Sequence, residues 1–369
     1  MGSAAAQQLA QRQKSVLGIE QFIPPHDQGS SHGGTRMIRQ AYWESPAYMP
    51  LILRAYELWE KLERDAGAKL LHITGGLILG SADSQLVTGG IAAADQHSIK
   101  YAVLSPGQIH ERFPVITPLP NDVAVYEERA GYLLAEECIR AQLRLAAHHG
   151  AEMHFEERVL GWSADSHGIK VSTDRCAYNA ERLIITAGPW ANQALPGLFP
   201  LNVTRQVMTW IQPLGGVGPF LADSFPVFLC DSSDDGFPGY GFPAVDGANG
   251  GVKAAIHGSH VVCTPETVDR EVHESDLAAV IRALSPRFPS LAGQILKATT
   301  CLYTMTPDEH FIIGLHPQFP SVNVACGFSG HGFKFAPVVG EILAQLATAG
   351  KTSHPIEIFS PGRFAMRPQ

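Results

Sequence analysis

Five short stretches of the sequence combine glycine or proline with side chains that could bind a ligand or react. The first, residues 29–39 (GSSHGGTRMIR), joins small residues to two arginines. Small residues let the backbone approach a ligand, and a helix starting near Thr35 would put Arg36 and Arg39 on one face. Two guanidiniums at a helix start oppose the helix dipole, so we expect an anionic partner for them. Arginines in surface ion pairs on a solvated helix are the alternative.

The second stretch carries a lysine and a histidine. In residues 252–257 (VKAAIH), a strand would place Lys253 and His257 on one face, and a helix would also bring them together. A lysine kept from water can lose its proton or polarise a bound oxidant, and a nearby histidine can shape or titrate a site. An edge-strand lysine and a hydrogen-bonded histidine are the alternative, which the pattern alone favours.

The third and fourth stretches lie towards the C-terminus. In residues 301–310 (CLYTMTPDEH), Cys301 by itself indicates a small buried hydrophobic residue. Residues 326–335 (CGFSGHGFKF) lead into a helix expected over residues 337–349, and their glycines would let its first amides face an anionic ligand. Lys334 is unfavourable beside the positive end of a helix unless an anion neutralises it. This is the most specific local signal, because a capping loop needs neither the glycines nor the lysine.

The fifth stretch and the first residues both indicate a nucleotide. Residues 186–190 (TAGPW) follow an apolar strand, where a phosphate or ribose could approach or the chain could simply turn. A helix opening at Gly2 and a strand over residues 15–19 that ends at Glu20 match the second half of a dinucleotide-binding βαβ unit. Its first strand and first two glycines would precede Met1. An ordinary surface helix and strand are the alternative.

Other elements must position these residues. Apolar spacing predicts helices over residues 48–63 and 139–147, and strands within residues 70–79, 123–126, 159–171 and 182–186. Residues 205–253 alternate strands with glycine- and proline-rich turns. Helix–strand alternation at both ends, around a β-rich middle, predicts a mixed α/β protein in which a substrate domain interrupts a nucleotide domain.

Composition limits the classes of function. Of 369 residues, 45% are hydrophobic and 17% charged, against roughly 25% charged in an average chain, which excludes a disordered protein or a coiled coil. The net charge of −8 and the absence of a basic run disfavour nucleic-acid binding. The apolar runs are too short to span a membrane. Six cysteines without CxxC or zinc spacing indicate reduced thiols, no metal and a cytoplasmic protein.

Three segments resemble a known family. TPDEHFIIGLHP, GFSGHGFKFAPVVGEILAQLA and PPHDQGSSHGGTRMIRQAY closely resemble the monomeric sarcosine oxidase family, which includes N-methyltryptophan oxidase and pipecolate oxidase. The resemblance covers nearly the whole chain in the same order and is weakest over residues 210–235. It implies an FAD-dependent oxidase of N-methyl or cyclic secondary amino acids, which oxidises the amine to an imine and reduces O2 to hydrogen peroxide. It also favours a monomer.

The same resemblance implies the domain organisation. A Rossmann-like FAD-binding domain, lacking its first strand, would comprise residues 1–71, 135–204 and 309–369. An inserted antiparallel-sheet substrate domain would comprise residues 72–134 and 205–308.

The resemblance also assigns roles to individual residues. Cys301 would hold the flavin through a thioether to its 8α carbon, Arg39 and Lys334 would bind the substrate carboxylate, and Lys253 would promote the reaction with O2. Arg36 would lie beside the flavin ring and Glu20 would bind the ribose. The remaining residues would line the substrate pocket (His257, Tyr240, Tyr303) or contact FAD (Gly2, Ser30, His32, Thr35, Gly188, Gly330, His331, Gly332).

Two departures from the family keep other functions open. The first strand of the βαβ unit is not in the sequence, and Trp43, beside Glu44, stands where the family usually has glycine, which could reshape the pocket entrance. One alternative is therefore an FAD-deficient, inactive homologue that acts as a binding module. The other is a flavin dehydrogenase that passes electrons to an acceptor other than O2.

Overall fold

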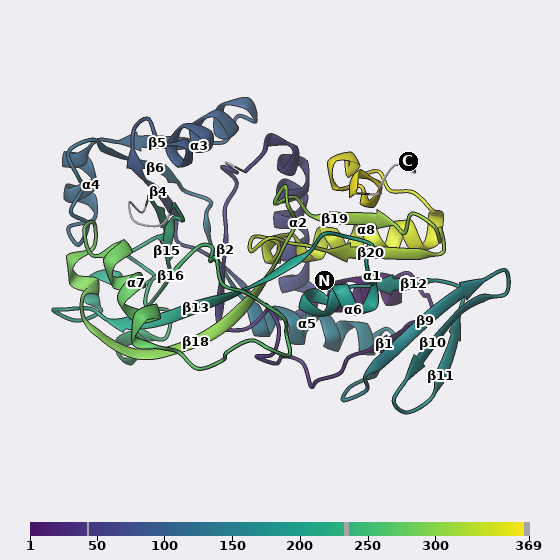
Figure 1. Ribbon diagram of the computed structural model, residues 1–369. Helices are drawn as coiled ribbons and strands as arrows, with labels where there is room; N and C mark the ends of the chain where they lie inside the picture. Colours follow the sequence, from purple (N-terminus) through teal and green to yellow (C-terminus); the bar gives the residue numbers. More distant parts are fainter. Residues whose placement is uncertain (43, 232–235, 365–369) are drawn as a thin grey trace.

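The computed structural model describes residues 1–42, 44–231 and 236–364, so Trp43 lies outside the described residues. Strands and helices are gathered into two parts that lie side by side (Figure 1). One part is built on a large sheet and the other on short strands covered by helices. The expectation of a mixed α/β fold is confirmed.

The large sheet has nine strands and is mostly antiparallel. Its strands come from two separate segments of the chain, and β14 pairs with β4 in parallel where the segments meet. The long strands β13 and β18 pair along almost their whole length. In chain order the strands are β4 (Gly76–Ser81), β5 (Tyr101–Leu104), β6 (Asp122–Glu127), β13 (Asn202–Gln212), β14 (Val227–Cys230), β15 (Gly239–Gly241), β16 (Val252–Ile256), β17 (Val262–Cys263) and β18 (Gln294–Met305).

Helices cover this sheet at several places. A buried apolar cluster that includes Phe225, Phe228 and Phe288 packs beneath the strands. The helices of this part are α3 (Gln85–Gln96), α4 (Pro106–Arg112) and α7 (Glu274–Leu284), none of which the sequence patterns predicted. Two adjacent glycines inside α3 weaken its helical signal, and its Ser84 cap supplies the start that the pattern did not reveal.

The second part contains two separate groups of short strands. β1 (Leu17–Ile19) pairs in parallel with β8 (Glu152–His154), and β12 (Leu183–Ile185) pairs in parallel with β20 (Val322–Cys326), which also pairs with β19 (Ile312–Leu315). Within the part of the chain that the structure describes, no strand lies between β1 and β12 and joins them into one sheet. A hairpin sheet of β9 (Val159–Asp165), β10 (Gly168–Thr173) and β11 (Ala177–Ala180) projects from this part (Figure 1).

Among the described residues, four long helices and the short α6 (Ala191–Ala194) pack around these strands. The long helices are α1 (Gly2–Gln11), α2 (Met49–Ala66), α5 (Ala135–His148) and α8 (Ala336–Ala349). A Cβ on Gly340 would lie 2.6 Å from the backbone of Ala4, so α8 and α1 approach each other as closely as a glycine allows. The helices predicted at the N-terminus and over residues 48–63, 139–147 and 337–349 are confirmed as α1, α2, α5 and α8.

The predicted helix at Thr35 is wrong. Residues Thr35–Ile38 form strand β2, which pairs with β7 (Gly131–Leu134), and β7 pairs with β3 (Leu71–Ile73). Gly33 and Gly34 both have positive φ, +92° and +79°, and turn the chain into an extended strand. Arg36 lies within β2 and Arg39 directly after it, and the two side chains have separate partners: Arg36 contacts Ser30, Thr35 and Cys301, and Arg39 contacts Ala41 and Glu44.

Among the described helices, none has the length and apolar character needed to cross a bilayer.

Candidate functional site

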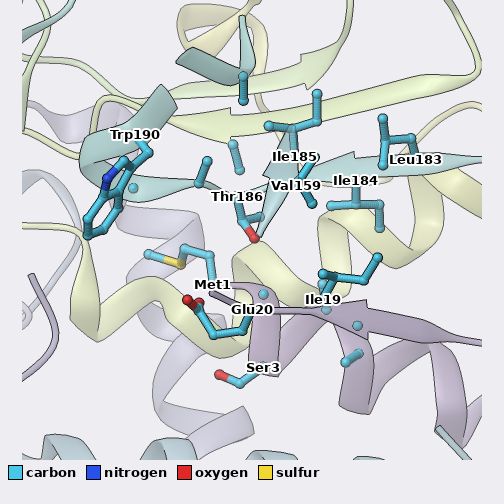
Figure 2. Close-up of a pocket in the computed structure, with 18 of the residues that line it drawn as sticks. Met1, Ser3, Ile19, Glu20, Val159, Leu183, Ile184, Ile185, Thr186 and Trp190 are labelled. Atoms are coloured by element: carbon cyan, nitrogen blue, oxygen red, sulfur yellow. The ribbon is translucent and has the colours of Figure 1, made fainter. Parts of the chain in front are cut away.

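A cavity of about 1800 Å³ runs through the helix-rich part and reaches the large sheet. It exceeds the roughly 300–1,000 Å³ of pockets for small ligands, so it can take an extended molecule. One end is bounded by Gly2, Glu20 and Gly188, and the other by Ser30, Arg36 and Tyr303 with the loop before α8. Figure 2 shows the first end, where Glu20 follows β1, Met1 precedes α1 and Thr186 follows β12.

The first end has the features of a nucleotide site. A Cβ on Gly2 would lie 2.8 Å from the Thr186 hydroxyl oxygen, so α1 begins against the end of β12. The carboxylate of Glu20 accepts a hydrogen bond from the Phe22 amide at 3.1 Å and is partly exposed to the cavity. A carboxylate at the end of the strand after such a helix is placed to bind ribose hydroxyls. Gly188 has a φ of +52° and turns the chain after β12.

The other end places a thiol beside a guanidinium. Arg36 donates to the Ser30 and Thr35 carbonyls, both at 2.8 Å, and its Nη2 lies 3.8 Å from the Cys301 sulfur. Cys301 is 2% exposed and packs with Met208 and Trp210. Cys301 is therefore a buried thiol that lies beside a guanidinium of the cavity lining.

Lys253 lies buried behind Arg36. Its ammonium donates to the Gly33 carbonyl at 2.7 Å, the Thr35 carbonyl at 2.8 Å and the Thr35 hydroxyl at 3.3 Å. It also lies 4.8 Å from the ring centroid of Phe242 and 5.5 Å from that of Trp210. Burial, and then the charge of Arg36, lower the pKa of Lys253 well below its ordinary value. Three oxygen acceptors and two aromatic faces favour the protonated form.

A second group of charges surrounds the ring of Tyr42. The Arg39 guanidinium lies 4.6 Å from the ring centroid and the Lys334 ammonium 5.1 Å from it. Nη2 of Arg39 contacts both carboxylate oxygens of Glu44 at 2.7 Å. The Tyr42 hydroxyl contacts Nδ1 of His331. Two cations, one internal carboxylate and a neutral ring system thus share one buried site.

Burial and charge set the ionisation of this group. Burial raises the pKa of Glu44, but the charges of Arg39, His331 and Lys334 outweigh it and lower that pKa to about 2. Burial lowers the pKa of Lys334 to about 7 and that of His331 to about 3. At neutral pH, Glu44 and Arg39 are therefore charged, His331 is neutral, and Lys334 is near its midpoint.

A histidine and two tyrosines lie between the charged groups. Nδ1 of His257 lies 3.4 Å from the Tyr303 hydroxyl, and the His257 ring lies 6.0 Å from that of Tyr240. Burial lowers the pKa of His257 to about 4 and raises those of both tyrosines. A Cβ on Gly330 would lie 2.3 Å from the Tyr303 ring, so only glycine lets the loop before α8 pack there. These side chains form a neutral polar wall.

The predicted residues separate into two sets. Those that line the cavity are Gly2, Glu20, Ser30, Arg36, Gly188, Tyr303, Gly330 and Gly332. The remaining residues are not among those that line the cavity: Cys301 and Thr35 contact Arg36 of the lining, His257 contacts Tyr303 of the lining, and the others are Lys253, Arg39, Lys334, Tyr240, His32 and His331.

The sequence patterns missed several contributors. Tyr42, which lies against both cations, and Glu136, which binds the Gly33 and Gly34 amides, received no role. Glu44 was noted only beside Trp43. The sequence did contain a signal for the charges around Tyr42: an aromatic residue, Tyr42, and an acid, Glu44, lie within five positions of Arg39.

The residues present fit FAD, an extended dinucleotide with an anionic diphosphate. The hydroxyl of Thr304, which faces the cavity, and Nε2 of His32 are buried without a hydrogen-bond partner, as expected of groups that bind a ligand. The glycine-rich loop leads into α8, where backbone amides can meet an anion. Among the described residues, no group of three or more His, Cys, Asp or Glu side chains could hold a metal ion.

The fold and this cavity define a dinucleotide-binding protein of mixed α/β type. A family model described as FAD dependent oxidoreductase (DAO) matches residues 1–346. The chain is 48% identical to the monomeric sarcosine oxidase of Streptomyces avermitilis over 370 residues, covering all of this chain and 96% of that one. It is 34% identical to N-methyl-L-tryptophan oxidase of Yersinia pestis, covering 99% and 96%. This protein belongs to the FAD-dependent oxidoreductase family.

Solved structures show the same fold. NikD, an unusual amino acid oxidase, matches with a TM-score of 0.85 and 24% identity, covering 97% of this chain and 94% of that one. L-proline dehydrogenase from P. horikoshii matches with a TM-score of 0.84 and 25% identity, covering 98% and 94%. The resemblance inferred from the three sequence segments is therefore confirmed, and the protein is a flavin-dependent amine oxidoreductase similar to monomeric sarcosine oxidase.

Proposed function

We propose that the protein oxidises N-methyl or cyclic secondary amino acids, of the sarcosine, N-methyltryptophan or pipecolate type, and reduces O2 to hydrogen peroxide. The observation that carries this proposal is the pair of cations, Arg39 and Lys334, around one buried ring beside the neutral wall of His257 and Tyr303. An amino acid presents an anionic carboxylate and an amine a few ångströms apart, which suits a cationic site next to a neutral polar one. The 48% identity to a monomeric sarcosine oxidase supports the same substrate class.

When bound, FAD supplies the redox chemistry by taking a hydride equivalent from the carbon next to the amine and passing two electrons to O2. The protein holds it along the cavity. Glu20 and Gly2 serve the adenosine end, with Gly188 beside them. Towards the other end, the flavin ring would be held by Arg36, together with Ser30, His32, Thr35 and the loop carrying Gly330, His331 and Gly332.

Cys301 is the attachment point for the flavin in this proposal, through a thioether to the 8α carbon. Its sulfur lies 3.8 Å from Arg36 and 4.0 Å from the Gly29 carbonyl, and both of those residues line the cavity. Covalent attachment fixes the ring and tunes its electronics.

The substrate carboxylate binds Arg39 and Lys334, and to do so it displaces Glu44 from the guanidinium. His257 is neutral because burial lowers its pKa to about 4, so its ring can accept a hydrogen bond from the amine. Tyr240 and Tyr303 complete the wall and exclude water.

Lys253 favours O2 as the electron acceptor, since a buried ammonium stabilises negative charge that develops on oxygen. The similarity to L-proline dehydrogenase favours a second candidate, a dehydrogenase with another acceptor. Comparing rates with O2 and with an artificial acceptor distinguishes the two.

The FAD-binding domain in this proposal comprises residues 1–71, 135–204 and 309–369. The substrate domain comprises residues 72–134 and 205–308. The support for this division is that the strands of the nine-stranded sheet come from residues 76–127 and 202–305. The protein works as a cytoplasmic monomer, for which its free cysteines and the similarity to monomeric relatives are the support.

The first experiment is an absorbance spectrum of the purified protein and then of its washed, acid-precipitated pellet. A yellow pellet is expected and shows covalent flavin. Peroxide release with sarcosine, N-methyltryptophan and pipecolate then identifies the substrate. A colourless native protein would instead mean an FAD-deficient binding homologue, and colour that washes out would retain the flavoenzyme but remove the thioether.

A further inference from the structure

We propose that Glu136 is a positioning residue for Lys253, and that it thereby sets the rate at which O2 is reduced. Its carboxylate holds the Gly33–Gly34 turn, and this turn supplies a carbonyl that binds the lysine ammonium. The inference rests on the proposed function, in which Lys253 serves the oxygen reaction.

Glu136 lies near the start of helix α5. The Gly33–Gly34 turn lies between Glu136 and Lys253. One carboxylate oxygen accepts from the Gly33 amide at 2.7 Å, and both oxygens accept from the Gly34 amide at 3.1 Å. The Ala135 amide donates to the Gly34 carbonyl at 2.8 Å. The Gly33 carbonyl, on the opposite side, accepts from Lys253 at 2.7 Å. The Gly33–Gly34 turn therefore connects a partly buried anion, Glu136, to a buried cation, Lys253.

The turn needs this anion because of its backbone conformation. Gly33 and Gly34 have φ of +92° and +79°, which directs two successive N–H groups to one point. Successive amides that converge in this way form a concave site for an anion. A Cβ on Gly33 would lie 2.7 Å from the Met208 side chain, so the turn is also fixed from that side. Glu136 fills the site from within the protein and is not among the residues that line the cavity.

Glu136 also balances charge around Lys253. The ionisable groups that act on the lysine are Arg36 on β2, Lys297 and Cys301 on β18, and Glu136 on α5. His32, in the loop before β2, experiences the charges of both Lys253 and Glu136. Arg36 and Lys297 lower the pKa of Lys253, whereas Glu136 raises it. Loss of the Glu136 charge would therefore leave a smaller fraction of Lys253 protonated.

The affected step is the reaction with oxygen. O2 would take two electrons from the reduced flavin, and the two protons needed to form hydrogen peroxide would come from the flavin and the surrounding water. A protonated Lys253 favours this step by stabilising negative charge on oxygen, and the step does not involve the amino acid. Oxidation of the amine uses the Arg39 and His257 side of the site. A change at Glu136 should thus separate the two half-reactions.

The test compares Glu136→Gln with Glu137→Gln in the flavin-loaded enzyme. Glu137 is the next residue of the same helix, but it is exposed and pairs with Arg140. The flavin is reduced with dithionite without O2 and then mixed with O2, so the reoxidation assay itself needs no substrate; reduction is measured with the substrate that the peroxide assay identifies. We expect Glu136→Gln to slow reoxidation about tenfold, because the Gly33 carbonyl that binds Lys253 is less firmly held and a smaller fraction of Lys253 is protonated. The pH profile of reoxidation should move to lower pH, while anaerobic reduction by substrate stays within about twofold.

A second measurement is independent of turnover. Hydrogen exchange of the peptide over residues 30–38 should be faster in Glu136→Gln than in Glu137→Gln, because the Gly33 and Gly34 amides lose their acceptor. If Glu136→Gln does not fold, Glu136→Asp is used instead. It keeps the charge on a shorter side chain and should slow reoxidation relative to Glu137→Gln, by less than the factor expected for Glu136→Gln.

Each outcome decides between the two proposals. Unchanged reoxidation in Glu136→Gln, or equal slowing of both half-reactions, overturns the positioning role. If Lys253→Met reoxidises at the normal rate, the role of Lys253 in the proposed function fails instead. In that case the positioning role of Glu136 is overturned as well, and faster exchange in Glu136→Gln would show only that Glu136 stabilises the Gly33–Gly34 turn.

Discussion

Replacing Glu44 by glutamine should make the enzyme less stable but should strengthen its binding of carboxylates. Arg39 and Glu44 form a buried ion pair in which the side chains are only 6% and 12% exposed. Glutamine keeps the shape of Glu44 and removes its charge. Arg39 is then left with a buried, unbalanced positive charge, which a ligand carboxylate can neutralise.

The structure gives the size of the effect. The pKa of Glu44 falls from 4.5 to about 2, a difference of about 2.5 units, or roughly 3 kcal/mol at 1.36 kcal/mol per unit. Because the pKa is lower in the folded state, this stabilisation is complete above pH 4.5 and is lost as the pH falls towards 2. Removing one partner of a buried pair costs about 3–5 kcal/mol in other proteins, so both arguments give a similar loss at pH 7.

Thermal unfolding with and without acetate measures both effects. Acetate has only a carboxylate, so it reports on the cationic site and not on the amine site. We expect the Tm of Glu44→Gln to be lower than that of the wild type without acetate, and to rise more when acetate is added. The Kd for acetate should fall by at least about tenfold, equivalent to about 1.4 kcal/mol.

The control is Glu57→Gln, which removes a surface carboxylate that pairs with Arg54 and should change neither quantity by much. Equal acetate affinity in the wild type and in Glu44→Gln would refute the reasoning. That result would mean that Arg39 does not bind the ligand carboxylate, whatever the loss of stability.

Three further predictions concern the flavin, oxygen and pH. Cys301→Ser should leave the flavin removable, so that the acid-precipitated pellet is colourless; a yellow pellet would identify another residue as the anchor. Lys253→Met should slow flavin reoxidation by O2 about 10²–10³-fold, the typical cost of losing one electrostatic donor, with little change in anaerobic reduction. Equal slowing of both steps would reject the role of Lys253. Burial lowers the pKa of Lys334 to about 7, so it loses its charge as the pH rises, and acetate affinity should fall between pH 6 and 9; a flat profile would contradict Lys334 as a carboxylate ligand.

Several parts of the fold follow from local sequence. The helices α2, α5 and α8 were predicted because their apolar residues recur at helical spacing, and this spacing reflects burial of one face. α3 was not predicted, because two glycines interrupt its pattern. β2 was predicted as a helix, because the spacing of Arg36 and Arg39 suits a helix and the spacing alone does not reveal the strand partner β7.

The sequence by itself determined the family and the identity of most of the proposed site residues. Motifs such as GFSGHGFKF keep their residue types in order along the chain, and glycines are required where a Cβ would collide, as at Gly330. These motifs can therefore be recognised along the chain without knowing which segments are in contact.

Only the tertiary structure decided which charges meet. Arg39 pairs with Glu44 across a loop, Lys253 reaches Gly33 over 220 positions of sequence, and Glu136 meets the same turn from a helix 103 positions away. The physical reason is that burial and a few ångströms of distance determine an ion pair and its pKa, and both quantities depend on how distant segments pack. The sequence contains the charged residues, and their partners are fixed only when the sheet and the helices come together.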